Sequence, residues 1–198
     1  SFIFYPFDYL DKNCYYNILG REINTMKYLV IKKDITTLSC DAIVNSANQY
    51  LVKGSGICKK IYEMAGEEQL AKCLCGYKIN EGECVVTDSF ELHSKYIFHV
   101  LTPKYYIKNN LNIELLSSCY SSILKAASCY NCKSIAIPCI GTGHHGWPLD
   151  LSSNIALDTL YWVYNKLYTE STIEEIIFCC YTWQQYLTYK GLIYSRRL

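Results

Sequence analysis

The chain has 198 residues and a formal net charge of +1. That length supports one well-formed hydrophobic core, and the near-neutral charge argues against binding of nucleic acid or a membrane surface through bulk electrostatics. No apolar run reaches the roughly 18 residues of a membrane span and the first residues lack the basic leader of a signal peptide, so a cytoplasmic or nuclear protein is expected.

Short apolar runs alternate with helical patterns along most of the chain. After an aromatic, irregular segment at residues 1–25, which is expected to pack on the domain as an N-terminal arm, strands are predicted at 28–31 and 42–44 and a helix at 57–66. Strands at 84–87 and 96–100, a helix at 111–126 and a strand at 134–137 follow. A long helical pattern then begins at Leu149 and includes a helix at 155–167, and a last strand is predicted at 176–180. This alternation predicts one α/β domain, residues 26–198, with a mixed or mostly parallel sheet covered on both faces.

The sequence contains 12 cysteines, and their placement favours reduced thiols. Several lie in or beside strand-like runs, where cysteine behaves as a small buried hydrophobe: Cys84, Cys139, Cys179 and Cys180. The Cys73-x-Cys75 and Cys129-x-x-Cys132 spacings lack a second regular pair or a histidine cluster. We therefore expect no metal, with structural zinc and disulfides as the less favoured alternatives.

Two glycine-rich stretches follow predicted strands. The first is Gly54-Ser-Gly56, and the second is Ile-Gly-Thr-Gly-His-His-Gly-Trp-Pro at residues 140–148. Glycines let a backbone approach a ligand closely, and free N–H groups beside a helix start favour an anion. The second stretch matches neither the P-loop nor the G-x-G-x-x-G dinucleotide fingerprint.

Ligands of open α/β sheets bind at the carboxyl ends of the strands. That rule predicts that Asp34, residues 45–56, residues 141–147 and Tyr181 meet at one end of the molecule.

These segments resemble the macrodomains, the ADP-ribose-binding modules, over nearly all of residues 26–190. The stretches that carry the resemblance are 33–36, 41–48, 54–56, 82–87, 95–99 and 137–143, the second of which ends in Val44-Asn-Ser-Ala-Asn48. The resemblance implies a three-layer α/β/α sandwich with a mixed, mostly parallel central sheet. It also implies a cleft for ADP-ribose, as ligand or product, and no cofactor.

The resemblance assigns the adenine end of that ligand to three residues. Asp34, with Ile35 beside it, matches the aspartate that accepts a hydrogen bond from the adenine amino group. Tyr181 matches the position whose side chain covers the adenine face. The alternatives are that Asp34 caps a helix or turn and that Tyr181 only packs.

The distal ribose and the diphosphate are assigned in the same way. Asn48 matches the asparagine that hydrogen-bonds the distal ribose in the hydrolytic members and is the catalytic candidate. Alternatively it fixes its own loop, a role that is expected more of Asn45. The backbones of two loops would bind the diphosphate without a lysine, and they comprise Gly54, Ser55, Gly56 and Ile57, then Gly141, Thr142, Gly143, His144 and His145.

The chain departs from the family pattern at two positions. Cys58 stands where hydrolytic members commonly have an aspartate, although residues 56–62 resemble the alphavirus replicase macrodomains, which have cysteine there and still hydrolyse. A helix N-terminus would lower its thiol pKa, but a space-filling role is favoured over a nucleophile. His145 replaces a usual Tyr or Phe, and its imidazole could stack, bind a phosphate or titrate near neutral pH, or be merely solvated. His99, inside a strand, is expected to be a satisfied core residue.

Two functions follow from the resemblance. One is hydrolysis of the bond between ADP-ribose and a protein carboxylate, or deacylation of O-acyl-ADP-ribose. The other is a non-catalytic module that recognises mono-ADP-ribosylated proteins. It is favoured because the region from Gly82 onward resembles the macrodomain of ganglioside-induced differentiation-associated proteins. A poly(ADP-ribose) glycohydrolase would need a glutamate pair beside a glycine loop, and none lies there. The expected partners are ADP-ribose and mono-ADP-ribosylated proteins, with the chain a monomer.

Overall fold

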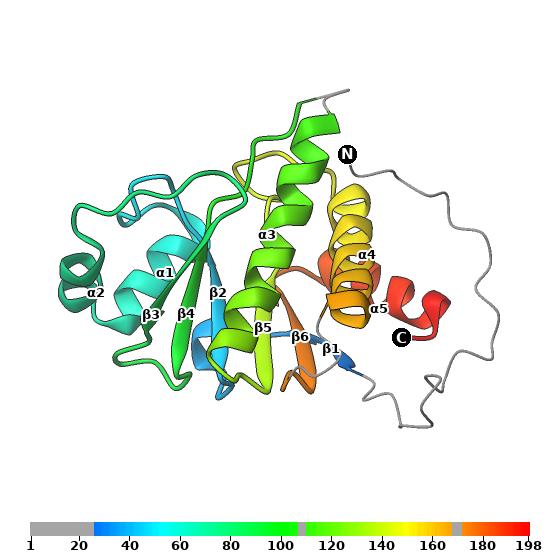
Figure 1. Ribbon diagram of the computed structural model, residues 1–198, viewed down its shortest axis with the longest axis horizontal. Coiled ribbons are helices and arrows are strands. Elements are labelled where there is room, and N and C mark those ends of the chain that lie inside the picture. Colours follow the sequence, from blue (N-terminus) through cyan, green and yellow to red (C-terminus); the bar gives the residue numbers. More distant parts are fainter. Residues whose placement is uncertain (1–25, 107–109, 168–171) are drawn as a thin grey trace.

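A six-stranded mixed sheet forms the centre of the molecule in the computed structural model, which describes residues 26–106, 110–167 and 172–198 (Figure 1). The strands are β1 (Lys27–Lys32), β2 (Ala42–Ser46), β3 (Cys84–Asp88), β4 (Tyr96–Val100), β5 (Ser134–Pro138) and β6 (Glu175–Cys180). Their order is β1-β6-β5-β2-β4-β3, and every neighbouring pair is parallel except β3 with β4. The predicted mixed, mostly parallel sheet is therefore confirmed.

Helices cover both faces of this sheet and complete a three-layer α/β/α sandwich. The helices are α1 (Gly56–Ala65), α2 (Glu67–Leu74), α3 (Asn110–Cys129), α4 (Leu149–Leu167) and α5 (Trp183–Arg196), with a short 3-10 helix η1 (Ile35–Thr37). One hydrophobic cluster joins α1 and α2 to the sheet, and a second joins α3, α4 and α5 to its other face. The predicted arm at residues 1–25 lies outside the described residues.

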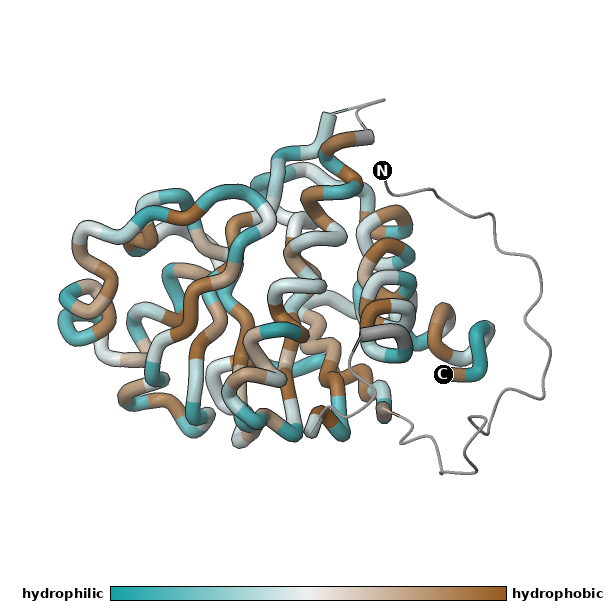
Figure 2. Tube along the Cα trace, viewed as in Figure 1, coloured by the Kyte–Doolittle hydropathy of each residue, from teal (hydrophilic) through white to brown (hydrophobic). Residues whose placement is uncertain are grey.

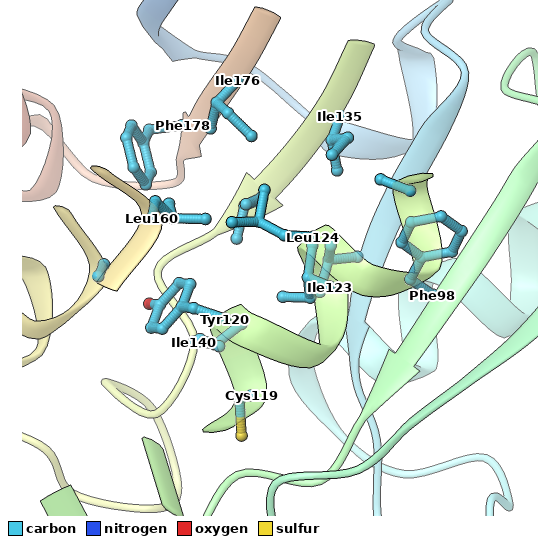
Figure 3. Packing of buried hydrophobic residues seen from close by; sticks show 14 of the residues in the cluster. Phe98, Cys119, Tyr120, Ile123, Leu124, Ile135, Ile140, Leu160, Ile176 and Phe178 are labelled. Carbon is cyan, nitrogen blue, oxygen red and sulfur yellow. The ribbon is translucent and has the colours of Figure 1, made fainter. Parts of the chain in front are cut away.

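The alternation of side chains along the strands separates the two clusters. In β2, Ala42 and Val44 face the α3–α4–α5 side and Ile43 faces the α1–α2 side, and all three are fully buried. Figure 3 shows Tyr120 and Leu124 of α3 among the strand residues of the larger cluster. Such double-sided burial explains why these strands read as continuous apolar runs, visible as brown segments in the centre of Figure 2.

Two helices were not predicted from the sequence, α2 and α5. Gly66 ends α1 in the left-handed conformation, with φ of +90°, as predicted, but it also precedes α2, which was not predicted. Helix α4 begins at Leu149, where the predicted helical pattern begins, whereas α5 was not predicted at all. Among the described residues, no helix is both long and apolar enough to cross a membrane.

Candidate functional site

A cleft of about 910 Å³ opens at the carboxyl ends of β1, β2, β5 and β6. The structure brings every predicted site residue to this one cleft, as the rule for parallel strand ends requires. The lining includes Asp34, Ile35, Asn48, Gly54, Ser55, Gly56, Ile57, Cys58, Gly141, Thr142, Gly143, His144, His145 and Tyr181.

The Asn48 side chain fixes the loop that follows β2. Its Oδ1 accepts hydrogen bonds from the backbone N–H groups of Tyr50 and Val52, both at 3.2 Å, and its Nδ2 donates to the Val52 carbonyl at 2.6 Å. The packing is close enough that a Cβ on Gly54 would lie 3.4 Å from that Nδ2. The loop-fixing alternative therefore describes what Asn48 does in this structure, and one Nδ2 hydrogen stays available to a ligand.

The start of α1 forms the floor of the first glycine loop. Ser55 occupies the N-cap position, but its side chain makes no capping hydrogen bond. Gly56 follows with φ of +56°, and a Cβ there would meet nothing within 4 Å. Backbone N–H groups at an uncapped helix start suit an anion, because they lack intrahelical acceptors and sit at the positive end of the helix dipole.

The second loop is anchored on a buried tryptophan. Gly141 adopts φ of +84°, and a Cβ there would lie 2.8 Å from Trp147 Cδ1. The Trp147 indole N–H donates to the Pro103 carbonyl at 2.8 Å, and its backbone N–H donates to the Gly141 carbonyl at 3.0 Å. Gly143, in contrast, has an ordinary φ and open space around its Cβ position, so this residue is free to face a ligand without strain.

At the far end of the cleft, Asp34 joins η1 to α1. Its Oδ1 accepts from the Thr36 backbone N–H at 3.0 Å and from the Thr36 hydroxyl at 2.7 Å. Its Oδ2 lies 3.7 Å from the Lys60 ammonium nitrogen. Partial burial opposes ionisation, but the Thr36 hydrogen bonds and the Lys60 charge outweigh it and hold the Asp34 pKa below its usual value. The carboxylate is thus both a turn cap and an ionised acceptor at the mouth of the cleft.

The Tyr181 ring stands in solvent next to this carboxylate end, with 86% of the residue exposed. Its backbone N–H donates to Gln185 Oε1 at 2.9 Å, and the Thr182 N–H donates to the same oxygen at 3.1 Å. The Thr182 bond is half of the capping box that begins α5, and the Tyr181 bond adds to it. The backbone of Tyr181 is therefore held in place while its side chain is exposed to solvent.

The Macro domain family model matches residues 44–156, a segment that contains both glycine loops and α1. The chain belongs to the Macro domain family. A "Macro domain-containing protein" of Chlorobaculum tepidum is 38% identical over 152 residues, which cover 77% of this chain and 87% of that relative. Human "ADP-ribose glycohydrolase MACROD2" is 36% identical over 168 residues, which cover 84% of this chain and 39% of that longer protein.

Solved macrodomain structures superpose on nearly the whole chain. A variant of the Oceanobacillus iheyensis macrodomain with ADPR has a TM-score of 0.79 and 29% identity, over 90% of this chain and 98% of that one. The Trypanosoma brucei macrodomain in complex with ADP-ribose has a TM-score of 0.76 and 28% identity, over 84% of this chain and 68% of that one.

Cys58 of this macrodomain is a packing residue in the first turn of α1, beside the cleft. It is 5% exposed, and its sulfur lies 3.8 Å from both Asn45 Nδ2 and the Val52 carbonyl oxygen. Burial raises its thiol pKa, and the hydrogen bonds only partly offset that effect. The expectation that the helix start would lower this pKa is therefore wrong, because the thiol is desolvated in the core beside it.

His145 is held by the macrodomain scaffold and is not a free loop side chain. The residue is half-buried, its Nδ1 pairs with the Thr102 hydroxyl, and its carbonyl accepts from the Tyr105 N–H at 2.8 Å. Burial, followed by the charges of His144 and Lys104, lowers the His145 pKa from its usual value. Burial and the neighbouring positive charges thus favour the neutral imidazole over the imidazolium ion.

A buried polar network beneath the first loop confirms the predicted core role of His99. Asn45 Nδ2 lies 3.0 Å from His99 Nδ1, and Thr87 Oγ1 lies 3.0 Å from His99 Nε2. An amide donor at Nδ1 leaves the proton on Nε2, so the imidazole is neutral and donates to Thr87. Burial lowers the His99 pKa to about 4. Asn45, fully buried, has the structural role expected of it.

Sequence reasoning missed two polar residues of this macrodomain cleft. Lys60 reaches the cleft from α1 to pair with Asp34, and Gln185 donates from Nε2 to the Thr142 hydroxyl at 3.4 Å. The Thr182-x-x-Gln185 pattern is a capping-box signature and would have predicted both α5 and the inward turn of Gln185. Within the described ranges, no group of three or more His, Cys, Asp or Glu side chains could hold a metal ion.

Proposed function

We propose that this macrodomain binds ADP-ribose in the cleft and removes mono-ADP-ribose that is attached to protein carboxylates. The observation that carries the proposal is the gathering of one ionised carboxylate, one exposed ring and two glycine loops into a single cleft of about 910 Å³. Cleft volumes of this order suit small-molecule ligands. The proposal is supported by the similarity to the ADP-ribose glycohydrolase MACROD2 and to the Trypanosoma brucei macrodomain in complex with ADP-ribose.

The adenosine would occupy the end of the cleft formed by η1 and the start of α5. Asp34 Oδ2 would accept the adenine amino group and exchange its contact with Lys60 for it, while Oδ1 keeps its bonds to Thr36. The exposed Tyr181 ring would close over the adenine face, where aromatic contact adds to apolar burial.

The diphosphate would lie between the two glycine loops. Backbone N–H groups at the start of α1 and around Gly143 would bind its oxygens, because both loops present backbone without a side chain in the way. This arrangement needs no lysine, which agrees with the near-neutral net charge of +1.

Chemistry would take place at C1 of the distal ribose, held next to Asn48. A water molecule positioned by the diphosphate and the loop backbones would attack C1, the bond from C1 to the carboxylate oxygen would break, and the protein carboxylate would leave. The products would be ADP-ribose, a free carboxylate and a proton. Orientation of water and sugar is an effect able to supply several kcal/mol. Deacylation of O-acyl-ADP-ribose would use the same positioning.

A second function, recognition of mono-ADP-ribosylated proteins without turnover, is favoured by two observations. The Asn48 amide already bonds its own loop, and the Cys58 position carries a buried thiol in place of a carboxylate. Neither residue can act as a general base in this state.

One pair of measurements separates these functions. ADP-ribose is titrated by calorimetry, and a carboxylate-linked mono-ADP-ribosylated protein is incubated with the domain for hours. Binding near micromolar strength, about −8 kcal/mol, with release of ADP-ribose supports the hydrolase. Binding of that strength without release supports the recognition module, and no binding at millimolar ADP-ribose contradicts both.

A further inference from the structure

Two cysteines meet at the base of the cleft, where β5 and β6 end. Pro138 pairs with Cys179 in the parallel register, so Cys139 and Cys180 occupy the next position on adjacent strands. Their sulfur atoms lie 3.9 Å apart, and both residues line the cleft. Adjacent strands are about 4.8 Å apart, which falls within the range of Cα separations that a disulfide can bridge.

The environment of this pair makes its two thiols unequal. Cys139 is partly exposed and donates a hydrogen bond from its S–H to the sulfur of Cys180, which is fully buried. That hydrogen bond lowers the pKa of Cys180 and raises the pKa of Cys139. The thiolate is the nucleophilic form of cysteine, so Cys180 is the attacking sulfur and Cys139 the resolving one.

The neighbouring cysteine provides a contrast within the same strand. Cys179 lies on the opposite face of the sheet, and its thiol donates to the Lys33 carbonyl at 3.1 Å. Burial is the main cause that raises its pKa to about 12. It also lines the cleft, but it packs in the cluster that contains Cys40 and not with the Cys139–Cys180 pair.

The pair is directly connected to both ligand-binding segments. Cys139 lies two residues before Gly141 of the second loop, and Cys180 directly precedes Tyr181. A disulfide has an S–S bond of about 2.05 Å, so bond formation draws the sulfurs together from 3.9 Å and displaces the strand ends that carry those segments. Close packing transmits such a shift.

We propose that Cys139 and Cys180 form a peroxide-reactive dithiol whose oxidation to a disulfide weakens ligand binding in the cleft. The part that concerns the ligand rests on the proposed function, whereas the thiol chemistry does not. The co-reactant is a hydroperoxide, with hydrogen peroxide as the smallest example.

The reaction balances in two steps. In the first step the Cys180 thiolate attacks one peroxide oxygen and the O–O bond breaks. Hydroxide is the leaving group, and Cys180 becomes a sulfenic acid. In the second step this hydroxide removes the proton of the Cys139 thiol and becomes water. The Cys139 thiolate then attacks the Cys180 sulfur, and the S–O bond breaks to release a second hydroxide. That hydroxide takes up the proton that Cys180 lost before the first step. Two thiols and one peroxide thus give one disulfide and two waters, with two electrons passing from sulfur to oxygen.

The experiment treats the reduced full chain with one equivalent of hydrogen peroxide, blocks the remaining thiols and maps disulfides by peptide mass spectrometry. ADP-ribose affinity is measured by calorimetry on reduced, oxidised and dithiothreitol-recovered protein. We expect a Cys139–Cys180 disulfide, a loss of affinity of at least about fivefold and recovery after reduction. Saturating ADP-ribose should also shift the dithiol–disulfide equilibrium towards the dithiol, because coupling free energies between two sites are reciprocal.

In the variants Cys139→Ser and Cys180→Ser, peroxide should no longer lower the ADP-ribose affinity below that of the same variant in its reduced state. Cys179→Ser, the matched control, should still lose affinity on peroxide treatment. Absence of the disulfide in wild type, or a disulfide without a change in affinity, would overturn the proposal. If the reduced wild type does not bind ADP-ribose, the proposed function and its coupling to the dithiol are both contradicted. The peptide map still shows whether the disulfide forms.

Discussion

The Asp34 carboxylate and the Lys60 ammonium group lie 3.7 Å apart and connect η1 to α1 across the mouth of the cleft. Both side chains are substantially exposed, so water weakens their attraction and the pair contributes little to stability. A ligand amine can therefore displace Lys60 from Oδ2 at small cost. Lys60 therefore occupies a hydrogen-bond acceptor that a ligand can take over, and the ion pair is not an important stabilising contact.

The first prediction concerns that acceptor. Asp34→Ala should weaken ADP-ribose binding by about 1–3 kcal/mol, the cost of leaving the adenine amine without its partner. Asp34→Asn should lose affinity too, because its amide nitrogen faces Lys60, yet its oxygen can keep the bond from the Thr36 N–H. Calorimetry measures both. Thr36→Val, which removes only a hydroxyl bond to Asp34, is the control and should bind nearly as wild type does; normal binding by Asp34→Asn would place adenine elsewhere.

The second prediction uses the open space at Gly143. Gly143→Glu should fold normally, because its Cβ meets no atom within 4 Å, and should lose ADP-ribose binding, since like charges side by side cost several kcal/mol. Circular dichroism and calorimetry test the two halves. Gly143→Ala should lose much less affinity. Gly141→Ala should instead destabilise the fold, because of its φ of +84° and the clash with Trp147. A folded Gly143→Glu variant that binds normally would show that this loop is not the phosphate site.

The third prediction separates the two roles of Asn48. Asn48→Ala should lower the hydrolysis rate more than the ADP-ribose affinity, as expected for an interaction that matters most in the transition state. Asn48→Asp retains an oxygen that accepts from the Tyr50 and Val52 N–H groups but loses the Nδ2 donor. A rate defect in both variants assigns the effect to the donor. A defect confined to Asn48→Ala assigns it to loop shape.

The fourth prediction concerns Cys58. Cys58→Ala should change turnover little, whereas Cys58→Asp, which restores the residue common in hydrolytic members, should raise it. Because burial raises its thiol pKa, Cys58 should react with iodoacetamide at pH 7.5 more slowly than the exposed Cys73. Peptide mass spectrometry follows both labels. Rapid labelling of Cys58 accompanied by loss of turnover would make it a nucleophile.

The fifth prediction is a dependence of stability on pH that arises from His99. Its folded-state pKa is about 4, below the ordinary 6.5, so the folded state binds fewer protons than the unfolded state between these values. Stability is therefore complete above pH 6.5 and falls as pH decreases towards 4, by about 3 kcal/mol in total. Urea unfolding at pH 7, 5.5 and 4.5 should reveal the slope. His99→Gln cannot titrate and should show a flatter profile, even if it is less stable; an equal slope in both would assign the effect to other groups.

The parallel strands and their burial were predictable because each has a short, wholly apolar run, of which residues 42–44 are the clearest case. The cleft was predictable for a topological reason, since Asp34 and the glycine loops all follow such strands. Helix α5 was missed because its pattern is masked by exposed apolar residues such as Trp183 and Leu187, which blur the amphipathic period.

The side-chain states were less predictable than the positions. The position of Cys58 at a helix N-terminus predicted a lowered thiol pKa, but the sequence does not show that the thiol lies in a core cluster. The Lys60–Asp34 pair joins residues 26 positions apart, and the sulfur contact of Cys139 with Cys180 spans 41 positions. Contacts of this kind depend on which strands become neighbours, and the chain order does not reveal that β6 lies between β1 and β5.

The Gln185 side chain has a wider consequence. Its carboxamide oxygen accepts from the Tyr181 and Thr182 N–H groups, and its nitrogen donates to Thr142 of the second loop. The Gln185 amide thus connects the segment at Tyr181, which would contact adenine, to the second glycine loop, which would bind the diphosphate. Ordering of either wall by one fragment of a ligand lowers the entropic cost of ordering the other. An intact nucleotide sugar should consequently bind more tightly than its two separate halves would suggest, and Gln185→Ala should make those halves energetically independent.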